Sequence, residues 1–404
     1  MIPTRRLVFA CVLVGLALRL AFALLYWVNQ PLTHDEREYL ALGRSVARGD
    51  GFLYPADEPR PGTAQQFGRA PGYPLFLATL RVMEPREQAP RRVQIAQAFV
   101  GALAIWLIAA IAGRAAGPRA AVAAAAIAAV YPPLVWMPAY MLSETLFSAL
   151  ALSAALSLQD RSRSAIPGAL LTGLAILTRP ALIFFLPFAA LWLWKTRRLA
   201  DAVIFVLLAA LCIAPWTIRN HRVYGRWIAV ASEGGVTFWT GNHPLAVGDG
   251  DLAANPAIKR AELAFRSAHP DLSAEQLEPL YYRDAFAWIR SDPAAWLRLL
   301  ARKAFYTVVP AGPSYAVHST RYVVASVAAY LLVLPAALAG AWRWRTSGRL
   351  AGPVPLWLMA ASTVAAGLVF FPQERFRIPV IDPALIVTAA LPAGLRNRER
   401  RAAE

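Results

Sequence analysis

The sequence predicts an all-α protein that crosses the membrane many times, and two observations support this prediction. The first is composition, because 58% of the 404 residues are hydrophobic and the mean hydropathy is +0.44, which is too apolar for a soluble chain of this length. The second is charge spacing, since apolar runs of membrane length alternate with short basic clusters, as cytoplasmic loops require. We expect about ten transmembrane helices with both termini in the cytoplasm.

The first predicted helix covers residues 7–28 and follows Arg5 and Arg6. A signal peptide also begins this way, but the run is long enough to span, and no convincing small-residue cleavage site follows it before Pro31, so we expect it to be retained. The other nine helices are expected at residues 93–112, 120–138, 143–158, 165–178, 180–194, 200–216, 320–341, 352–371 and 379–394. Further basic clusters mark their inner ends at Arg114 and Arg119, Arg161 and Arg163, Lys195 to Arg198, Arg343 to Arg349, and Arg396 to Arg401.

Residues 165–194 form an unusual predicted hairpin, because each half is shorter than a full span and Arg179-Pro180 separates the halves. Charge at both ends still favours two crossings, with a tilted or partly re-entrant turn between them. We expect Arg179 to be structural.

This topology predicts three regions. Residues 1–216 form a membrane module whose first outer loop, residues 29–92, is the catalytic segment. Residues 217–319 form an outer region with amphipathic helices at the membrane surface, and residues 320–404 form the last helices and a basic cytoplasmic tail. The protein is therefore expected in the inner, or plasma, membrane with its active site facing the periplasm or exterior.

The net charge of +17 does not indicate nucleic-acid binding, because the excess lies in the basic clusters between apolar runs and no reader motif accompanies it. Cys11 and Cys212 both lie inside apolar runs, so a structural disulfide is not expected. The sequence has no P-loop, dinucleotide fingerprint or zinc-spaced set of cysteine and histidine, which predicts that no nucleotide cofactor is bound.

Two adjacent carboxylates, Asp35 and Glu36, stand in the segment THDEREY just after the first helix. Acidic side chains close to hydrocarbon are costly and often serve a site, which favours a catalytic role. A second interpretation is that they only cap a surface helix, for which Thr33 or Asp35 is a suitable N-cap residue. Glu144 has the same two interpretations at the start of the fourth predicted helix.

The predicted topology places many polar side chains on the outer side, at or near helix ends, where they could converge. They are Asp35, Glu36, Arg69, Ser143, Glu144, Arg179, Arg219, Asn220, Glu374, Arg375 and Arg377. Arg219, Arg375 and Arg377 could instead be interfacial anchors.

A series of motifs in this order resembles a known group: HDEREY, RAPGYPLF, MLSETLF, GLAILTRP, APWTIRN, GNHPLAVG and ERFRIPVIDP. Together they cover nearly the whole chain and are similar to the polyprenyl-phosphate-dependent glycosyltransferases of the GT-C fold. The nearest relatives are the dolichyl-phosphate-mannose-protein mannosyltransferase-like and aminoarabinose transferase-like families. The resemblance implies a GT-C-like helical fold and a polyprenyl-phosphate-linked sugar donor.

The resemblance also implies roles for single residues. The catalytic carboxylates fall on Asp35, the expected general base, and on Glu36 and Glu144, which would orient the acceptor or ligate a divalent cation, so Asp35 and Glu144 are the candidate metal ligands. Arg69 stands where the family often has lysine, and the two are not equivalent phosphate ligands. The expected holders of the donor phosphate are Arg69, Arg219, Arg375 and Arg377, and the expected substrate contacts are His34, Tyr39, Tyr73 and Asn242.

The chemistry of sugar transfer agrees with these assignments. A base must take the acceptor proton, and fixed positive charge must stabilise the departing phosphate. The acceptor could be a lipid, a glycan or a protein. A transporter or flippase of lipid-linked saccharides is the alternative function, but it should place ionisable groups near the middle of the membrane. A non-catalytic scaffold would require no convergence of these side chains.

Overall fold

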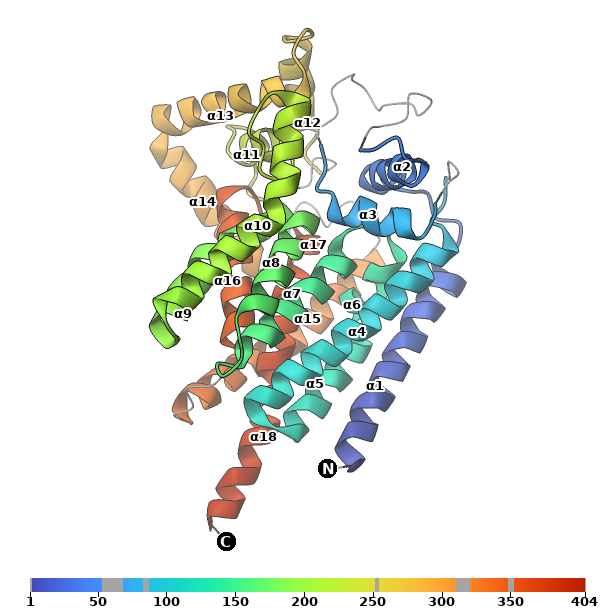
Figure 1. The fold of residues 1–404 in the computed structure, drawn as a ribbon, viewed down its shortest axis with the longest axis vertical. Helices are drawn as coiled ribbons and strands as arrows, with labels where there is room; N and C mark the ends of the chain where they lie inside the picture. Colours follow the sequence, from blue (N-terminus) through green and yellow to red (C-terminus); the bar gives the residue numbers. More distant parts are fainter. Residues whose placement is uncertain are drawn as a thin grey trace.

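The computed structural model describes residues 2–52, 68–82, 87–250, 254–309, 320–347 and 352–403. Across these residues the structure is helical apart from connecting segments and an isolated antiparallel bridge between Pro31 and Gln88. The helices form a long bundle with a layer of shorter helices at one end (Figure 1). Both chain termini lie at the opposite end of the bundle (Figure 1).

Apolar helices make up the bundle. They are α1 (Ile2–Ala21), α4 (Arg91–Ala116), α5 (Pro118–Val130), α6 (Pro132–Trp136), α7 (Glu144–Gln159), α8 (Ile166–Thr178), α9 (Phe185–Thr196), α10 (Leu199–Tyr224), α15 (Thr320–Thr346), α16 (Val354–Val369) and α18 (Ile381–Ala403). A π-helical turn, Phe22–Tyr26, extends α1. Short 3-10 turns at Met137–Ala139 and Pro180–Phe184 follow α6 and precede α9.

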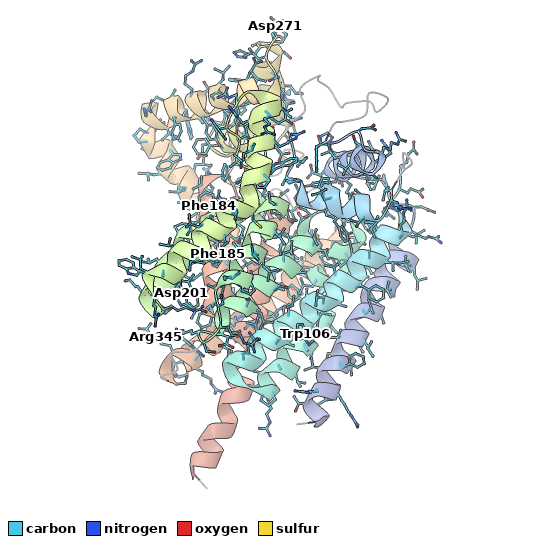
Figure 2. The ribbon with its side chains drawn as sticks, in the orientation of Figure 1. Trp106, Phe184, Phe185, Asp201, Asp271 and Arg345 are labelled. Carbon is cyan, nitrogen blue, oxygen red and sulfur yellow. The ribbon has the colours of Figure 1, made fainter. Side chains whose placement is uncertain are left out.

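Small side chains allow the bundle helices to approach closely. Ala120, Ala124 and Ala128 of α5 are buried, and α5 packs against α1, α4 and α18. A Cβ atom at Gly340 of α15 would lie 2.0 Å from the carbonyl oxygen of Thr388 in α18, so only glycine fits this crossing. Close approach of this kind is how apolar helices pack in a membrane. Large apolar side chains such as Trp106, which is 49% exposed, point away from the bundle on its flank (Figure 2).

All ten predicted helical segments fall on helices of the structure, but ten membrane crossings are not confirmed. By length and composition, four helices of the described chain could cross: residues 4–26, 91–116, 199–224 and 320–346. The predicted helix at 120–138 is broken into α5 and the α6 segment with a bend of 67°, and this pair could make a fifth span. The break follows Tyr131, where two prolines begin α6.

The layer at the end of the bundle, which we call the end layer, contains the helices that flank the polar residues. They are α2 (His34–Arg48), α3 (Gly72–Thr79), α11 (Gly234–Gly241), α12 (Pro256–Ser267), α13 (Ala274–Ser291) and α14 (Pro293–Val308). A short helix, α17 (Glu374–Arg377), connects α16 to α18. The three-region division stays a prediction, although α10 runs through its first boundary at residue 216 and ends only at Tyr224.

Candidate active site

The first turn of α2 positions the first polar residues of the site. Thr33 is the N-cap, and its hydroxyl accepts a hydrogen bond from Glu36 N, while the Glu36 carboxylate accepts one from Thr33 N at 2.8 Å. This reciprocal capping box fixes the first turn of the helix. Because residues three apart share a helix face, Asp35 and Glu38 project together away from the cap.

Glu36 uses both carboxylate oxygens within the protein. One oxygen accepts hydrogen bonds from the backbone and hydroxyl of Thr33, and the other accepts one from Met141 N at 2.8 Å. The side chain is buried, and burial raises the pKa of Glu36 against these hydrogen bonds. The geometry thus favours capping over acceptor orientation, the two interpretations that the sequence left open.

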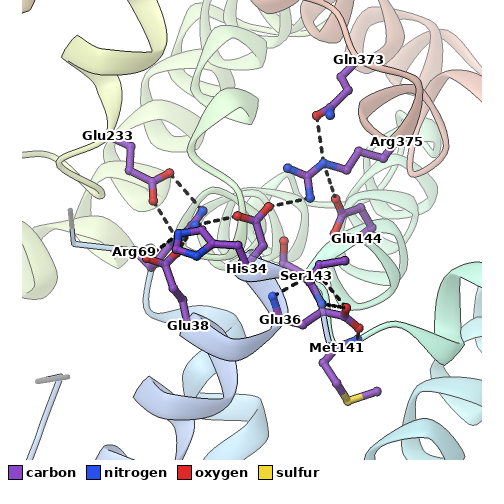
Figure 3. Close-up of polar contacts among 12 residues, drawn as sticks. His34, Glu36, Glu38, Arg69, Met141, Ser143, Glu144, Glu233, Gln373 and Arg375 are labelled. Carbon is purple, nitrogen blue, oxygen red and sulfur yellow. Dashed lines mark hydrogen bonds and ion pairs between the residues drawn. The ribbon is translucent and has the colours of Figure 1, made fainter. Parts of the chain in front are cut away.

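Arg69 lies among three carboxylates from two distant parts of the chain (Figure 3). Its guanidinium donates to Asp35 Oδ1 through Nη2 at 2.9 Å, to Glu38 Oε2 through Nε at 2.9 Å and to Glu233 Oε2 through Nη1 at 3.3 Å. Nε also lies 2.8 Å from Glu233 Oε1. Glu38 and Asp35 come from α2, whereas Glu233 directly precedes α11. Arg69 therefore links the start of α2 to the segment that follows α10.

Arg375 of α17 approaches Asp35 from the other side (Figure 3). Its Nη1 lies 2.7 Å from Asp35 Oδ2, its Nε donates to Gln373 Oε1 at 2.9 Å, and Glu144 Oε1 is 4.0 Å away. Each oxygen of the Asp35 carboxylate consequently has its own arginine. Burial by itself would raise the pKa of Asp35, but the charges and hydrogen bonds of Arg375 and Arg69 outweigh it and hold this pKa well below its ordinary value.

Glu144 begins α7 and is almost completely buried. Its Oε1 pairs with Arg179 Nη1 at 2.8 Å, and Arg179 also donates to the Ser143 hydroxyl at 3.2 Å. The sequence predicts a structural role for Arg179, but this residue lies directly beside Glu144, a predicted catalytic carboxylate. We call Asp35, Glu38, Arg69, Glu144, Arg179, Glu233 and Arg375 the charged cluster.

Glu233 has an unusual ionisation within this cluster. Burial, aided by the nearby charges of Glu38 and Asp35, raises the pKa of Glu233 from 4.5 to about 7, even though Arg69 opposes the change. About 30% of this side chain is exposed. A carboxyl group that titrates near neutrality beside an arginine is a feature typical of functional sites.

The three predicted substrate contacts of the first loop lie beside the cluster. His34 is exposed and its Nε2 is 3.5 Å from Glu38 Oε1. Tyr39 and Tyr73 are buried with their rings edge to face, and the guanidinium of Arg69 lies 5.3 Å from the centre of the Tyr39 ring. The Tyr73 hydroxyl donates to Gln97 at 3.0 Å, which links α3 to α4.

Three other predicted residues make their contacts elsewhere. Arg219 packs on the Trp216 ring and donates to Tyr224, at the end of α10. Arg377 is buried in a pair with Asp382 at 2.9 Å and stacks on Tyr330. Asn242 accepts hydrogen bonds from Trp296 and Lys303, at 3.1 and 3.0 Å, and donates to the carbonyl oxygen of Val369. Their substrate roles remain predictions, and these contacts favour structural roles.

The residues present do not fit a divalent cation well in this arrangement. Asp35 and Glu144, the two predicted ligands, are paired with Arg69, Arg375 and Arg179. A cation placed between them would meet three guanidinium groups, which repel it. No group of three potential ligands suited to a metal occurs among the described residues. We therefore assign no step to a metal, and metal dependence stays a prediction.

Two members of the charged cluster, Glu38 and Glu233, are not among the site residues that the sequence predicts. Glu38 carries a readable signal, because it follows Asp35 by one helical turn in the same motif. Glu233 gives no such signal, since its partner Arg69 lies far away in sequence. Arg19 was also missed, although an arginine inside the first apolar run marks a candidate functional residue by itself.

Comparison with known proteins supports the fold. No protein-family model matches the sequence, and a search of curated proteins finds no match. The archaeal oligosaccharyltransferase AglB from Archaeoglobus fulgidus, solved with an inhibitory peptide and a dolichol-phosphate, matches with a TM-score of 0.55 at 14% identity, over 96% of this chain and 50% of AglB. An Archaeoglobus fulgidus oligosaccharyltransferase solved with Zn and sulfate matches with a TM-score of 0.52 at 14% identity, over 96% and 48% of the two chains.

ArnT from Cupriavidus metallidurans, solved with undecaprenyl phosphate, aligns with a lower TM-score of 0.40 at 15% identity, over 95% of this chain and 77% of ArnT. The present chain spans about half the length of AglB. At such low identity the likeness to AglB establishes the fold. Together with the apolar helices, it makes this chain a membrane protein of the GT-C fold, as its motifs predicted.

Proposed function

We propose that this protein is a membrane glycosyltransferase that moves a sugar from a polyprenyl-phosphate donor to an acceptor hydroxyl, with Asp35 as the general base. The observation that carries this proposal is the position of Asp35, whose two carboxylate oxygens face Arg69 and Arg375 from separate segments. The GT-C fold adds support, because AglB, which shares it, was solved with a dolichol-phosphate.

The reaction requires one bond to form and one to break. The acceptor oxygen attacks the anomeric carbon of the sugar, and the bond from that carbon to the phosphate oxygen breaks. The acceptor proton passes to Asp35, and the electron pair leaves with the lipid phosphate. A single base without a partner nucleophile favours direct displacement, which inverts the anomeric centre.

Arginines of the charged cluster are suited to hold the phosphate. Arg375 is about one third exposed and presents a planar fork that matches phosphate oxygens. Arg69 is more deeply placed and is shared among three carboxylates, so less of its charge is available to a ligand. We therefore assign the main phosphate contact to Arg375 and a supporting contact to Arg69.

Donor binding would also activate the base. With both arginines on its oxygens, Asp35 has a strongly lowered pKa and is a poor proton acceptor. When the donor phosphate draws Arg375 away, Asp35 loses one stabilising cation and its proton affinity rises. Proton removal from the acceptor is thereby coupled to the presence of the donor.

We place this reaction on the outer face of the plasma membrane, with the termini in the cytoplasm. The end layer carries the charged cluster, and the termini lie at the other end of the bundle (Figure 1). The basic clusters at that other end agree with the positive-inside rule. The acceptor is a lipid, glycan or protein hydroxyl.

The test is sugar release and transfer by the purified protein in nanodiscs, with a panel of radiolabelled polyprenyl-phosphate sugars. Wild type is compared with Asp35→Asn and with Asp271→Asn, a matched variant whose carboxylate lies at the far tip of the end layer (Figure 2). We expect Asp35→Asn to lose activity by about 10²- to 10⁴-fold, the usual contribution of a general base. Asp271→Asn should keep it.

Two outcomes would contradict the proposal. Full activity in Asp35→Asn would remove Asp35 as the base. The second outcome is the absence of turnover with every donor, together with movement of a lipid-linked saccharide between leaflets when the same protein is reconstituted in liposomes. That result would favour the flippase alternative.

A further inference from the structure

A small cavity with a mainly apolar lining and a few polar side chains lies inside the bundle, next to Glu144 of the charged cluster. Residues from α1, α4, α7 and the segments near α6 and α18 line it, among them Arg19, Gly101, Glu144, Thr145, Ser148 and Pro379. About 20 Å³ of this space is open to the centre of a water molecule. That is enough for at least one ordered water, provided that polar groups face it.

Arg19 is the unexpected member of the lining, because it belongs to the apolar helix α1 and is only 1% exposed. Its Nη1 donates to the carbonyl oxygens of Gly15 and Ala129, at 2.9 and 3.3 Å, and its Nη2 donates to that of Ala128 at 3.3 Å. Ala128 and Ala129 are in the last turn of α5, so Arg19 caps this helix at the point where the span breaks.

The capping bonds use only the Nη atoms of Arg19. Its Nε has no hydrogen-bond partner among the described residues. The neighbouring helix accommodates this group, since a Cβ atom at Gly101 of α4 would lie 3.0 Å from Nε. A buried donor without a partner is destabilising, so a partner is expected in the cavity.

Two polar groups of α7 that belong to the lining residues are in the same condition. Glu144 Oε2 and the Thr145 hydroxyl have no hydrogen-bond partner in the part of the chain that the structure describes, and both are buried. The Ser148 hydroxyl, in contrast, already donates to the carbonyl oxygen of Pro379 at 2.7 Å. The cavity therefore brings together one free charged donor, one free carboxylate oxygen and one free hydroxyl.

We propose that the cavity binds ordered water that joins Arg19 to Glu144, and that Arg19 acts through this water as a positioning residue for the donor site. This inference rests on the proposed function. Glu144 is held from the cluster side by Arg179, with Arg375 4.0 Å away. When a donor phosphate draws Arg375 toward itself, positive charge beside the buried Glu144 carboxylate is lost, and a carboxylate with Arg179 as its one remaining cation would oppose this movement. Water bonded to Arg19 gives Glu144 a second partner.

Four variants separate this role from capping. Arg19→Met removes both, Arg19→Lys keeps the charge, and Thr145→Val removes a water ligand without touching α5. Ser148→Ala is the matched control, because its hydroxyl already has a protein partner. The measurements are binding of undecaprenyl phosphate in nanodiscs, KM and kcat for sugar transfer, and the melting temperature of each variant.

We expect Arg19→Met to weaken undecaprenyl phosphate binding and to raise the donor KM by about 10-fold, the effect of one charged hydrogen bond, with kcat within about twofold. Thr145→Val should act in the same direction without lowering the melting temperature. Arg19→Lys should restore most of the affinity, and Ser148→Ala should leave it unchanged.

A role in capping alone predicts a lower kcat and an unchanged donor KM for Arg19→Met, while the melting temperature falls in either case. That result would overturn the inference. So would a density map at water-resolving resolution in which the cavity is dry. If wild type binds no polyprenyl phosphate, the proposed function and the positioning role both fail, and the same map still decides whether the cavity holds water.

Discussion

Asp35 and Arg375 form an ion pair of 2.7 Å that joins the first turn of α2 to α17, near the two ends of the chain. Asp35 Oδ1 is at the same time bound by Arg69. The carboxylate is thus held in a fixed orientation by groups that α2 itself does not provide. Such preorganisation is what a catalytic carboxylate requires.

Removing Arg375 should change the pH dependence of the reaction. Arg375 and Arg69 lower the pKa of Asp35, so an Arg375→Gln variant raises this pKa and moves the acidic limb of the kcat/KM profile to higher pH. The donor KM should rise as well. The measurement is kcat/KM for sugar transfer across pH, with Arg345→Gln, far from the cluster, as control (Figure 2). If the acidic limb of the kcat/KM profile lies at the same pH in wild type and Arg375→Gln, Asp35 is not the group that titrates there.

Glu233 should make donor binding dependent on pH near neutrality. Its pKa is raised from 4.5 to about 7 by burial, with Glu38 and Asp35 adding to the effect and Arg69 opposing it. As pH rises through 7 the carboxyl group becomes charged and competes with the donor phosphodiester for Arg69. We expect donor affinity to be higher at pH 6 than at pH 8, and Glu233→Gln to remove this difference. If the donor affinities of wild type and Glu233→Gln depend equally on pH, Glu233 is not the group responsible.

The same shift has a consequence for stability. Between about pH 4.5 and 7 the folded protein binds more protons at Glu233 than the unfolded chain does. The contribution of this group is therefore fully present at low pH and is lost as pH rises through about 7. The melting temperature of Glu233→Gln should fall less steeply than that of wild type over this interval.

The capping box of α2 should matter for stability more than for chemistry. Thr33→Ala removes the hydroxyl that accepts from Glu36 N, and we expect a loss of about 1 kcal/mol in stability. Asp35→Asn leaves this cap intact but removes the negative charge between Arg69 and Arg375, so both stability and activity should fall, whereas Thr33→Ala should keep its activity. Chemical denaturation in detergent and the transfer assay compare the two variants. A loss of activity in Thr33→Ala as large as that in Asp35→Asn would contradict the separation.

Lys303 should contribute strongly to the stability of the end layer. Its ammonium donates to Asn242 at 3.0 Å and to the carbonyl oxygen of Leu368 at 3.1 Å, at the C-terminal end of α16. Lys303→Met leaves these buried acceptors with fewer donors, which should cost about 1–3 kcal/mol. Exposed Lys259→Met is the control, and proteolysis of the segment between α10 and α14 is the readout. Equal protease resistance of the two variants would refute this role.

Removal of divalent cations should leave the reaction intact. Asp35 and Glu144 already have arginine partners, so the positive charge that a metal would supply is present in the side chains. Transfer assayed with a chelator should match transfer with added Mg²⁺, Mn²⁺ or Zn²⁺. A large loss of transfer activity with the chelator, reversed by one of these ions, would contradict the prediction and show that a cation takes part in the reaction.

The positions of the helices could be predicted from the sequence because burial in lipid demands long apolar runs. The break between α5 and α6 was harder to see, since apolar residues continue through Tyr131 while the two prolines that follow bend the span. The length of α10 was underestimated for a similar reason. Arg219 and Asn220 suggested its end, but the helix continues to Tyr224.

The sequence predicts Asp35, Glu36, Arg69, Glu144 and Arg375 as site candidates from separate motifs, but it does not predict which of them pair. Asp35 and Glu36 were found because they are adjacent and follow an apolar helix. The division of their contacts was not readable, because Glu36 turns inward to cap α2 and Asp35 turns toward Arg375. Contacts such as Arg69 with Glu233 depend on how distant segments pack, and a single sequence carries no record of that.

The 26 residues of α10 span about 39 Å at the rise of an α-helix, which exceeds the roughly 30 Å hydrocarbon thickness of a bilayer. A helix of this length that crosses a bilayer either tilts or extends beyond the hydrocarbon, and the segment that follows α10 carries Glu233 to Arg69. A helix longer than its membrane responds to lipid chain length by tilting. Lipids of different chain length should therefore alter how closely Glu233 approaches Arg69, which makes the host membrane itself a determinant of this contact.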